Sequence, residues 1–282
     1  MRRLSGALAA SIGVLIATSA AAAPAGAPVV EIRDAVAKVI VSPEPRSDVV
    51  VEVVRANPRL PLRIWRFAGH TYIDGGLSFR LHDCGLRDGQ PHAVVAGVGD
   101  VSGNAIPQLV IHTPMDTRVS ASGAVWGQVG RTATLDFANG GCGDWELANV
   151  RGKLKVKQAG SGVTRTGQAA SADLSTAGSG SIATHAVAGS VTAMNVGSGN
   201  IDVAALNGAF DARIAGSGRV RAASGHASAM QASIAGSGGI DLDGVADSLR
   251  ASVVGSGDIH VSKVIGPVSK AVIGSGNVRI GS

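Results

Sequence analysis

Acidic and histidine side chains could give this 282-residue chain a catalytic site or a metal site. Its seven histidines show no zinc-like spacing with cysteine or carboxylate, and the one local cluster is His82-Asp83-Cys84. We therefore predict no metal and no other cofactor. Two carboxylates within several ångströms of each other could instead cleave a glycosidic bond. The candidates are Asp202 with Asp241 and Asp144 with Asp258, and their use depends on the elements that carry them.

Serine is another candidate nucleophile, because a Gly-Ser-Gly tripeptide recurs along the C-terminal half with first glycines spaced by 18, 19, 19, 20, 19 and 19 residues. The tripeptides follow neither the P-loop nor the dinucleotide-binding pattern. A serine that recurs in every copy is a poor candidate for a single catalytic residue. We interpret each copy as a structural corner, where glycine tolerates a positive φ. The predicted corner residues are Gly160, Ser161, Gly162, Gly178, Gly180, Gly197, Gly199, Gly216, Gly218, Gly236, Gly238, Gly255, Gly257, Gly274 and Gly276.

Apolar residues occupy fixed positions around each tripeptide. Four and six residues after the first glycine they flank a polar residue, as in Ile201-Asp202-Val203 and Ile240-Asp241-Leu242. This period of two is typical of a strand with one buried face. Two further apolar columns lie six residues before and nine residues after the first glycine, for example at Leu249 and Leu206. Three inward columns per repeat indicate a coil with three sides.

A single coil cannot cover its own apolar side, so neighbouring coils must stack to bury a continuous core. We therefore predict an all-β fold, a right-handed parallel β-helix of about eight to nine 19-residue, three-sided turns with a small N-terminal β-cap. The alternative is a meander of antiparallel hairpins. The repeat favours the parallel arrangement, because equivalent residues recur once per period and do not mirror one another across turns.

A polar column lies two residues before the first glycine in the first four repeats. It holds Asn139, Gln158, Thr176 and Asn195, and aliphatic residues follow in the later repeats. Strand alternation points this column inward, where stacked amides could hydrogen-bond to one another along the axis as a polar ladder. The alternative is that the first turns are wider and leave the column partly solvated.

The repeat separates the candidate catalytic carboxylates. Asp202 and Asp241 share a column with Arg221 between them, and Asp144 and Asp258 share another column, several turns apart. Turns held near 19 residues also leave no long loops from which a cleft could be built. We therefore predict that the chain is not an enzyme. A polysaccharide lyase or hydrolase built on a β-helix is the alternative.

The N-terminal residues have the features of a secretory signal peptide. Arg2 and Arg3 precede an apolar stretch over residues 8–16, and the small residues 19–23 offer cleavage sites. We predict a signal peptide over residues 1–22, export to the periplasm or cell surface, and no membrane insertion, because the apolar stretch is too short to span a bilayer. In an oxidising compartment Cys84 and Cys142 are expected to form a disulfide, with two separately buried thiols as the alternative.

Residues 23–103 lack the repeat. Segments rich in β-branched or alternating residues, such as 49–54 and 62–67, predict about four strands joined by short turns. The terminal coils of a repeat array need covering. We therefore predict a β-strand cap over residues 23–103 and the β-helix over residues 104–282.

Several of these features together resemble a known family. The opening strand 29–32, the segment Ile106-Pro107-Gln108-Leu109 and the iterated Gly-Ser-Gly-x-Ile/Val-x-Val are similar to the head GIN domain family of autotransporter adhesin heads. The likeness covers about residues 29–282 and implies a β-helical protein of the cell envelope, without carrying over any catalytic residue. An autotransporter needs a membrane β-barrel after its head, and none is expected in this sequence, which ends shortly after Ile280.

The charge and composition disfavour nucleic acid as a partner. The net charge of +5 is small and scattered, and 3% aromatic residues give few platforms for stacking bases. We expect instead an adhesin-like binding module or a structural module whose partner is an unknown envelope protein or a glycan. A homo-oligomer is also possible, because the last strand, near Val278 and Ile280, should leave an open edge.

Overall fold

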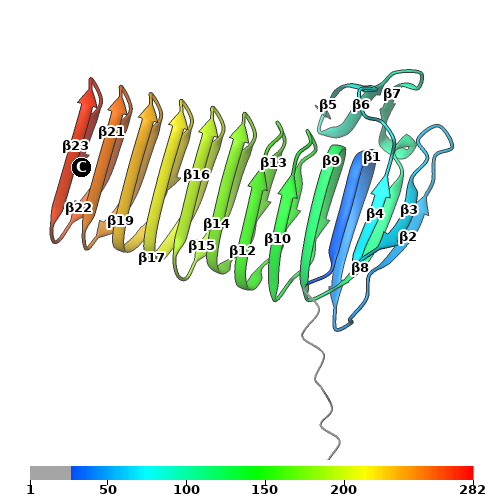
Figure 1. The fold of residues 1–282 in the computed structure, drawn as a ribbon, viewed down its shortest axis with the longest axis horizontal. Coiled ribbons are helices and arrows are strands. Elements are labelled where there is room, and N and C mark those ends of the chain that lie inside the picture. The colour runs from blue at the N-terminus through cyan, green and yellow to red at the C-terminus, as the bar shows by residue number, and fades with distance from the viewer. Residues whose placement is uncertain (1–26, 282) are drawn as a thin grey trace, which may run out of the picture.

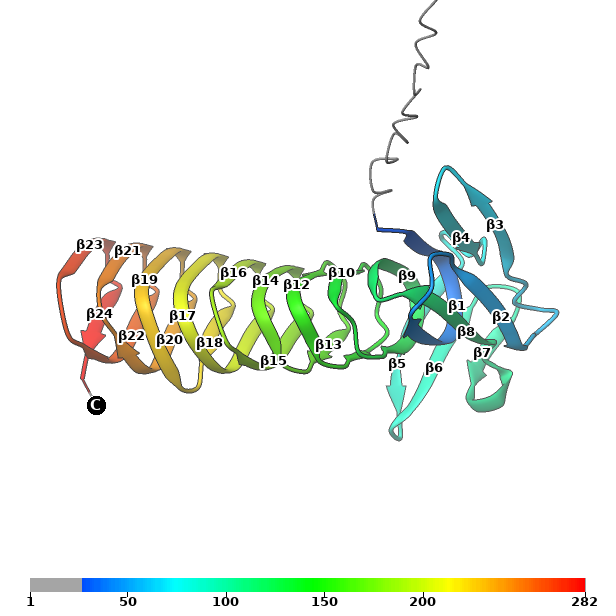
Figure 2. The same ribbon diagram turned by 90° about the horizontal axis from the view of Figure 1, so that it is seen from below.

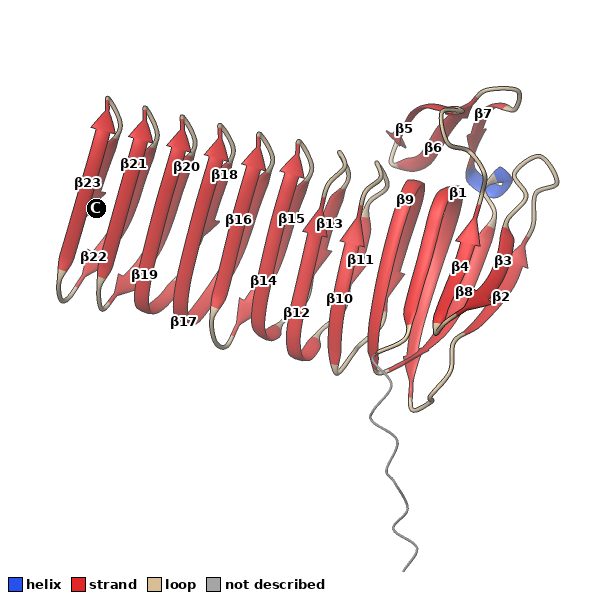
Figure 3. Cartoon of the chain, in the orientation of Figure 1, coloured by secondary structure: helices blue, strands red, loops and turns tan. Residues whose placement is uncertain are grey.

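The protein consists almost entirely of β-strands. The computed structural model describes residues 27–281, so the predicted signal peptide lies outside the described residues. These residues form a β-solenoid of about nine turns, stacked along one long axis (Figures 1 and 2). The one helical element among them is a short 3-10 helix, Gly103–Ala105 (Figure 3). The predicted parallel β-helix is therefore confirmed.

The repeat region supplies most of the strands, and each pairs in parallel with the equivalent segment one period away. The strands are β9 (Asp116–Val129), β10 (Thr134–Asn139), β11 (Trp145–Leu147), β12 (Val150–Gln158), β13 (Val163–Thr166), β14 (Ala169–Gly178), β15 (Ser181–Val187), β16 (Val191–Gly197), β17 (Asn200–Gly216), β18 (Arg219–Ala222), β19 (Gly225–Gly236), β20 (Gly239–Ala246), β21 (Leu249–Gly255), β22 (Asp258–Val264), β23 (Val268–Gly274) and β24 (Asn277–Ile280).

Each turn contains three paired segments. Before the corner, β16 pairs with residues 210–216 of β17, and after the corner, residues 200–203 pair with β18. A short third segment around Leu206 pairs with its equivalents in the turns on either side. Between β17 and β19 the register shifts after Gly208, so a bulge accommodates the extra residue of the 20-residue repeat. The inward side chains of all three segments form one continuous apolar core.

The glycines at the corners are required for two different reasons. Gly197 has a φ of 122°, in the region that L side chains rarely adopt. Gly199 has an ordinary φ, but a Cβ built there would lie 2.0 Å from the carbonyl oxygen of Gly180 in the preceding turn. The first glycine therefore permits the sharp bend, and the second lets neighbouring coils approach closely.

The parallel stack extends further toward the N-terminus than the repeat does. β1 (Val29–Glu44) pairs in parallel with β9 along both of its halves. β4 (His70–Asp74) and β8 (Gln108–Pro114) then stack on the two halves of β1. The solenoid therefore begins at β1, well before residue 104. The repeat does not reveal this coil because its corner contains Asp34, at a φ of 46°, in place of Gly-Ser-Gly.

Antiparallel strands close the N-terminal end. β2 (Val50–Arg55) pairs with β8, and β3 (Arg63–Phe67) pairs with β4. A separate three-stranded sheet of β5 (Leu81–Arg87), β6 (Gln90–Val95) and β7 (Gly99–Ser102) lies against the outside of the first turns. This sheet, here called the flap, has its own small core, in which Val95 and Val101 pack with Trp126 of β9.

Candidate binding face on the N-terminal cap

The exposed aromatic side chains gather at one end of the molecule. The chain has four Phe, three Trp and one Tyr. Trp126, Trp145, Phe137 and Phe210 are buried. The other four, Trp65, Phe67, Tyr72 and Phe79, lie within a short stretch of the N-terminal region, and Trp65 and Phe67 are 41% and 71% exposed. Phe79 is fully exposed in the turn between β4 and β5. Trp65, Phe67 and Tyr72 all come from β3 and β4, which marks this pair of strands as a candidate binding site.

A tight hairpin puts three of these rings on one face. Ala68 and Gly69 join β3 to β4 and both have positive φ, 49° and 79°, the conformation favoured in two-residue hairpin turns. Strand alternation then directs Thr71 and Ile73 into the core, where both are buried. The alternate residues face outward. We call the outward set the cap face, made of Glu31, Arg33, Trp65, Phe67, His70 and Tyr72.

Aromatic contacts hold the rings of the cap face in place. The Trp65 and Tyr72 rings, opposite each other on β3 and β4, stack with centroids 5.2 Å apart and an interplanar angle of 19°. The His70 ring stacks on Tyr72 at 5.7 Å. The Arg33 guanidinium carbon lies 4.6 Å from the Tyr72 centroid, within the range of a cation–π contact. Trp65 is therefore fixed on its Tyr72 side and remains accessible elsewhere.

Glu31 organises the charges of the cap face. Its carboxylate accepts a hydrogen bond from Arg33 Nε at 3.1 Å, and its Oε1 lies 2.7 Å from His70 Nδ1. Partial burial acts to raise the pKa of Glu31, but the hydrogen bonds with Arg33 and His70 outweigh that effect and hold the pKa below its ordinary value of 4.5. The same hydrogen bond raises the pKa of Arg33. At neutral pH, donors and an anion thus lie directly beside the aromatic rings.

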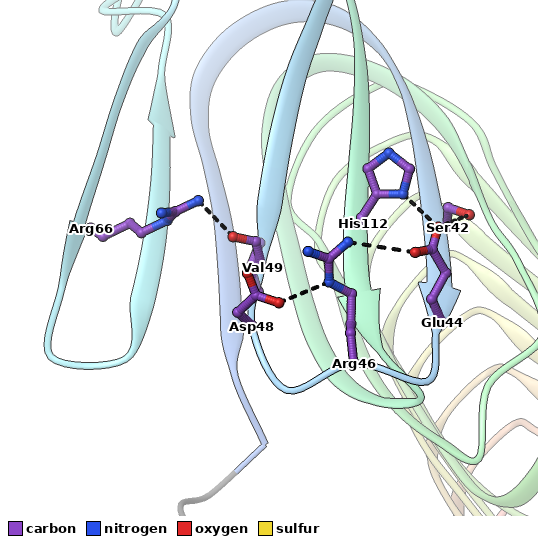
Figure 4. A network of polar contacts seen from close by, with 7 residues as sticks. All are labelled: Ser42, Glu44, Arg46, Asp48, Val49, Arg66 and His112. Carbon is purple, nitrogen blue, oxygen red and sulfur yellow. Dashed lines mark hydrogen bonds and ion pairs between the residues drawn. The ribbon is translucent and has the colours of Figure 1, made fainter.

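A cavity of about 810 Å³ adjoins the cap face. It lies between the loop before β2 and the tip of the β3–β4 hairpin, and Phe67 and His70 line both the cavity and the face. Its wall is braced by Arg66, which donates to the Val49 carbonyl at 2.6 Å (Figure 4).

A polar network supports the loop beside the cavity. Arg46 Nε donates to Asp48 at 3.0 Å, and His112 Nδ1 lies 2.5 Å from Glu44 Oε1 (Figure 4). The hydrogen bond with His112 lowers the pKa of Glu44, and that with Arg46 lowers the pKa of Asp48. The carboxylates of this network therefore stay ionised at neutral pH, and their hydrogen bonds hold the loop.

The predicted disulfide is present. Cys84 on β5 bonds to Cys142, which occupies the serine position of the corner between β10 and β11, with a Cα–Cα distance of 6.1 Å. The bond attaches the flap to the first repeat of the solenoid.

The polar column lies inside the solenoid, and all four of its side chains are buried. Its hydrogen bonds differ from the ladder expected along the axis. Asn139 accepts from the Gly141 N–H and donates to the Gly143 carbonyl at 2.8 Å, and Asn195 donates to the Gly199 carbonyl. Each asparagine thus braces the inside of its own corner, because the backbone just past the bend lies nearer than the next amide.

The candidate carboxylates do not come together. Parallel pairing places Asp202, Arg221 and Asp241 side by side in successive turns, so a guanidinium separates the two acids. Asp144 accepts a hydrogen bond from the Val163 N–H at 2.9 Å. Over residues 27–281, no group of three or more His, Cys, Asp and Glu is placed to hold a metal ion, and no helix in that range has the length and apolarity to cross a membrane.

Sequence reasoning missed the cap face. The signal was available, since half of the aromatic residues fall within residues 65–79 of a chain that has few of them. What the sequence could not indicate is that Glu31 and Arg33, far away in the chain, lie beside the hairpin, because that neighbourhood requires β1 to pair with β4.

Comparisons with known proteins support the fold and the family resemblance. A crystal structure from Parabacteroides distasonis ATCC 8503, described as a "Putative lipid binding protein", is 18% identical, with a TM-score of 0.54 over 91% of this chain and 93% of that chain. This likeness shows a shared fold. A search of curated proteins finds no match. Residues 152–264 match the family model described as "Putative auto-transporter adhesin, head GIN domain", which confirms the family resemblance over those residues.

Proposed function

We propose that the protein is an exported, non-enzymatic binding module of the cell envelope that contacts its ligand through the cap face. The observation that carries the proposal is the grouping of the Trp65, Phe67 and Tyr72 rings beside Arg33, Glu31 and His70. Export is supported by the adhesin family match, by the disulfide and by the signal-peptide features of residues 1–22.

A glycan is the ligand class that suits this face best. Flat rings at an open surface can stack on the apolar face of a sugar ring, and neighbouring charged and polar groups can hydrogen-bond to its hydroxyls. Lipid is a second ligand class to be tested, because the Parabacteroides protein is described as lipid binding.

The solenoid supports a non-enzymatic role. Its outward acids alternate with bases along the axis, as in Arg165 with Glu146 at 3.4 Å and Arg221 with Asp243 at 2.6 Å. Such exposed pairs are ordinary surface features that contribute little to stability. General acid–base cleavage of a glycan needs two carboxylates facing one bond, whereas Asp202 and Asp241 flank Arg221.

The test is binding of the purified mature protein to a glycan array and, separately, to phosphatidylethanolamine–phosphatidylglycerol vesicles. We expect glycan binding that Trp65→Ala weakens roughly tenfold, the effect of about 1.4 kcal/mol of lost ring contact. Met194→Ala is the matched control, because Met194 lies on the solenoid and is also 41% exposed.

Three results would contradict the proposal. They are vesicle binding without glycan binding, glycan binding that Trp65→Ala leaves unchanged, and turnover of any arrayed polysaccharide that Asp202→Asn or Asp241→Asn abolishes.

A further inference from the structure

β3 is an open edge of the sheet. Among the described residues it pairs only with β4, and all five of its residues are exposed. An unpaired edge strand offers free backbone groups to another strand. Arg63 and Arg66 supply the charge that commonly protects such an edge, but Ile64, Trp65 and Phe67 make it unusually apolar.

The hairpin fixes which backbone groups are free. Phe67 and His70 flank a two-residue turn, which makes them a hydrogen-bonded pair. Along an antiparallel ladder, hydrogen-bonded pairs alternate with pairs that are not hydrogen-bonded. Arg63, Trp65 and Phe67 therefore bond to β4. The N–H and C=O groups of Ile64 and Arg66 point to the open side, where they are available to an added strand.

The core is also open at this end. Ile64 on β3 and Val53 on β2 lie opposite the buried Ile73 and Leu109, yet they are 39% and 45% exposed. The turn that would cover them in a longer solenoid is missing. A partner that extended the sheet past β3 would remove this apolar area from water.

We propose that β3 pairs antiparallel with β3 of a second copy of this chain, with Trp65 on the twofold axis. In this register Ile64 and Arg66 of each copy exchange backbone hydrogen bonds, and all five residues of β3 are used. Arg63 lies opposite Phe67 of the second copy, an arrangement that suits a cation–π contact. A register centred on Arg63 or on Arg66 would instead place two like charges opposite each other, which is unfavourable.

The pairing would double the cap face. Trp65 already stacks on Tyr72 in each chain, so the twofold would produce one aromatic row across both molecules, with two rings from each. This consequence rests on the proposed function, whereas the dimer itself does not.

The mass of the mature protein in solution, measured by light scattering over a concentration series, tests the dimer. We expect twice the monomer mass, and we expect Trp65→Glu to weaken self-association at least tenfold by placing two carboxylates on the axis. Met194→Glu is the control for an added surface charge and should remain dimeric. A wild-type protein that stays monomeric throughout the series would overturn the proposal.

Cysteine crosslinking tests the register. Opposite residues in a pair without hydrogen bonds have Cα atoms about 4.5 Å apart, within disulfide range. A mixture of Arg63→Cys and Phe67→Cys proteins should therefore crosslink under mild oxidation, while Phe67→Cys alone should not, because its two copies would be about 13 Å apart along the strands. Equal crosslinking in both samples would overturn the register. A monomer that still binds glycans through Trp65 would contradict the dimer and leave the proposed function intact.

Discussion

At the residue scale, the corner glycines decide whether the coils can stack. Neighbouring turns lie about 4.8 Å apart, and Gly180, Gly199 and Gly218 follow one another at equivalent corners. A Cβ on Gly218 would lie 2.1 Å from the Gly199 carbonyl oxygen, much as one on Gly199 would meet Gly180. At each of these corners the backbone of the neighbouring turn leaves no room for a side chain, and that backbone cannot move away.

We predict that Gly199→Ala destabilises the protein by at least about 2 kcal/mol, because the added methyl group overpacks against backbone. Gly239→Ala is the matched control. Gly239 directly follows the corner Gly236-Ser237-Gly238, and a Cβ there meets nothing closer than 3.7 Å. We therefore expect the free energy of unfolding to change by no more than about 0.5 kcal/mol. Urea unfolding of both variants measures the difference. Equal stabilities would contradict this role of the corner glycine.

Glu31 is expected to make the stability of the cap face depend on pH. Its pKa is lowered in the folded protein, so its stabilising contribution is present above the ordinary value of 4.5 and is lost as the pH falls through the folded-state pKa. We predict that Glu31→Gln is less stable than wild type at pH 7 and that the difference shrinks in acid.

Unfolding free energies measured between pH 7 and pH 3 provide this comparison. Glu52→Gln, on the exposed strand β2, is the control for the removal of one surface carboxylate. A difference between Glu31→Gln and wild type that stayed constant down to pH 3 would contradict the assignment.

At the element scale, the flap is joined to the solenoid by its small core and by one disulfide. The bond closes a separation of 58 residues, which in the chain-entropy account corresponds to roughly 4 kcal/mol. We predict that Cys84→Ser/Cys142→Ser loosens β5, β6 and β7 selectively, because the solenoid core does not include them. Hydrogen exchange should accelerate in the flap and remain slow in β16 to β21. Uniform acceleration would show that the bond stabilises the whole fold instead.

The repeat coils were predictable from the sequence because equivalent residues of each copy occupy the same structural environment. Gly-Ser-Gly at a regular spacing and the alternation in Ile201-Asp202-Val203 specify corner, strand and inward face together. The first coil was not predictable in this way. β1 bends at Asp34, and its partners β4 and β8 follow long after it in the chain, so periodicity gave no information about where it lies.

At the scale of the whole molecule, the Gly-Ser-Gly repeat coils and the N-terminal end have different surfaces. The repeat coils display paired charges and small residues turn after turn, while the exposed rings are confined to the N-terminal region. The candidate site could be predicted only in its composition, from the cluster of Trp65, Phe67 and Tyr72. Its charged half comes from β1 and requires the three-dimensional fold. On the proposed function, the repeat coils are the support that carries the cap face.

The most direct test of this account is hydrogen exchange of the mature protein with and without purified cell-envelope polysaccharide. If the cap face is the ligand contact, protection should appear in β3 and β4 and in the first half of β1, while the Gly-Ser-Gly corners between residues 160 and 276 should exchange unchanged. Protection spread along those corners, or none in β3 and β4, would contradict the account.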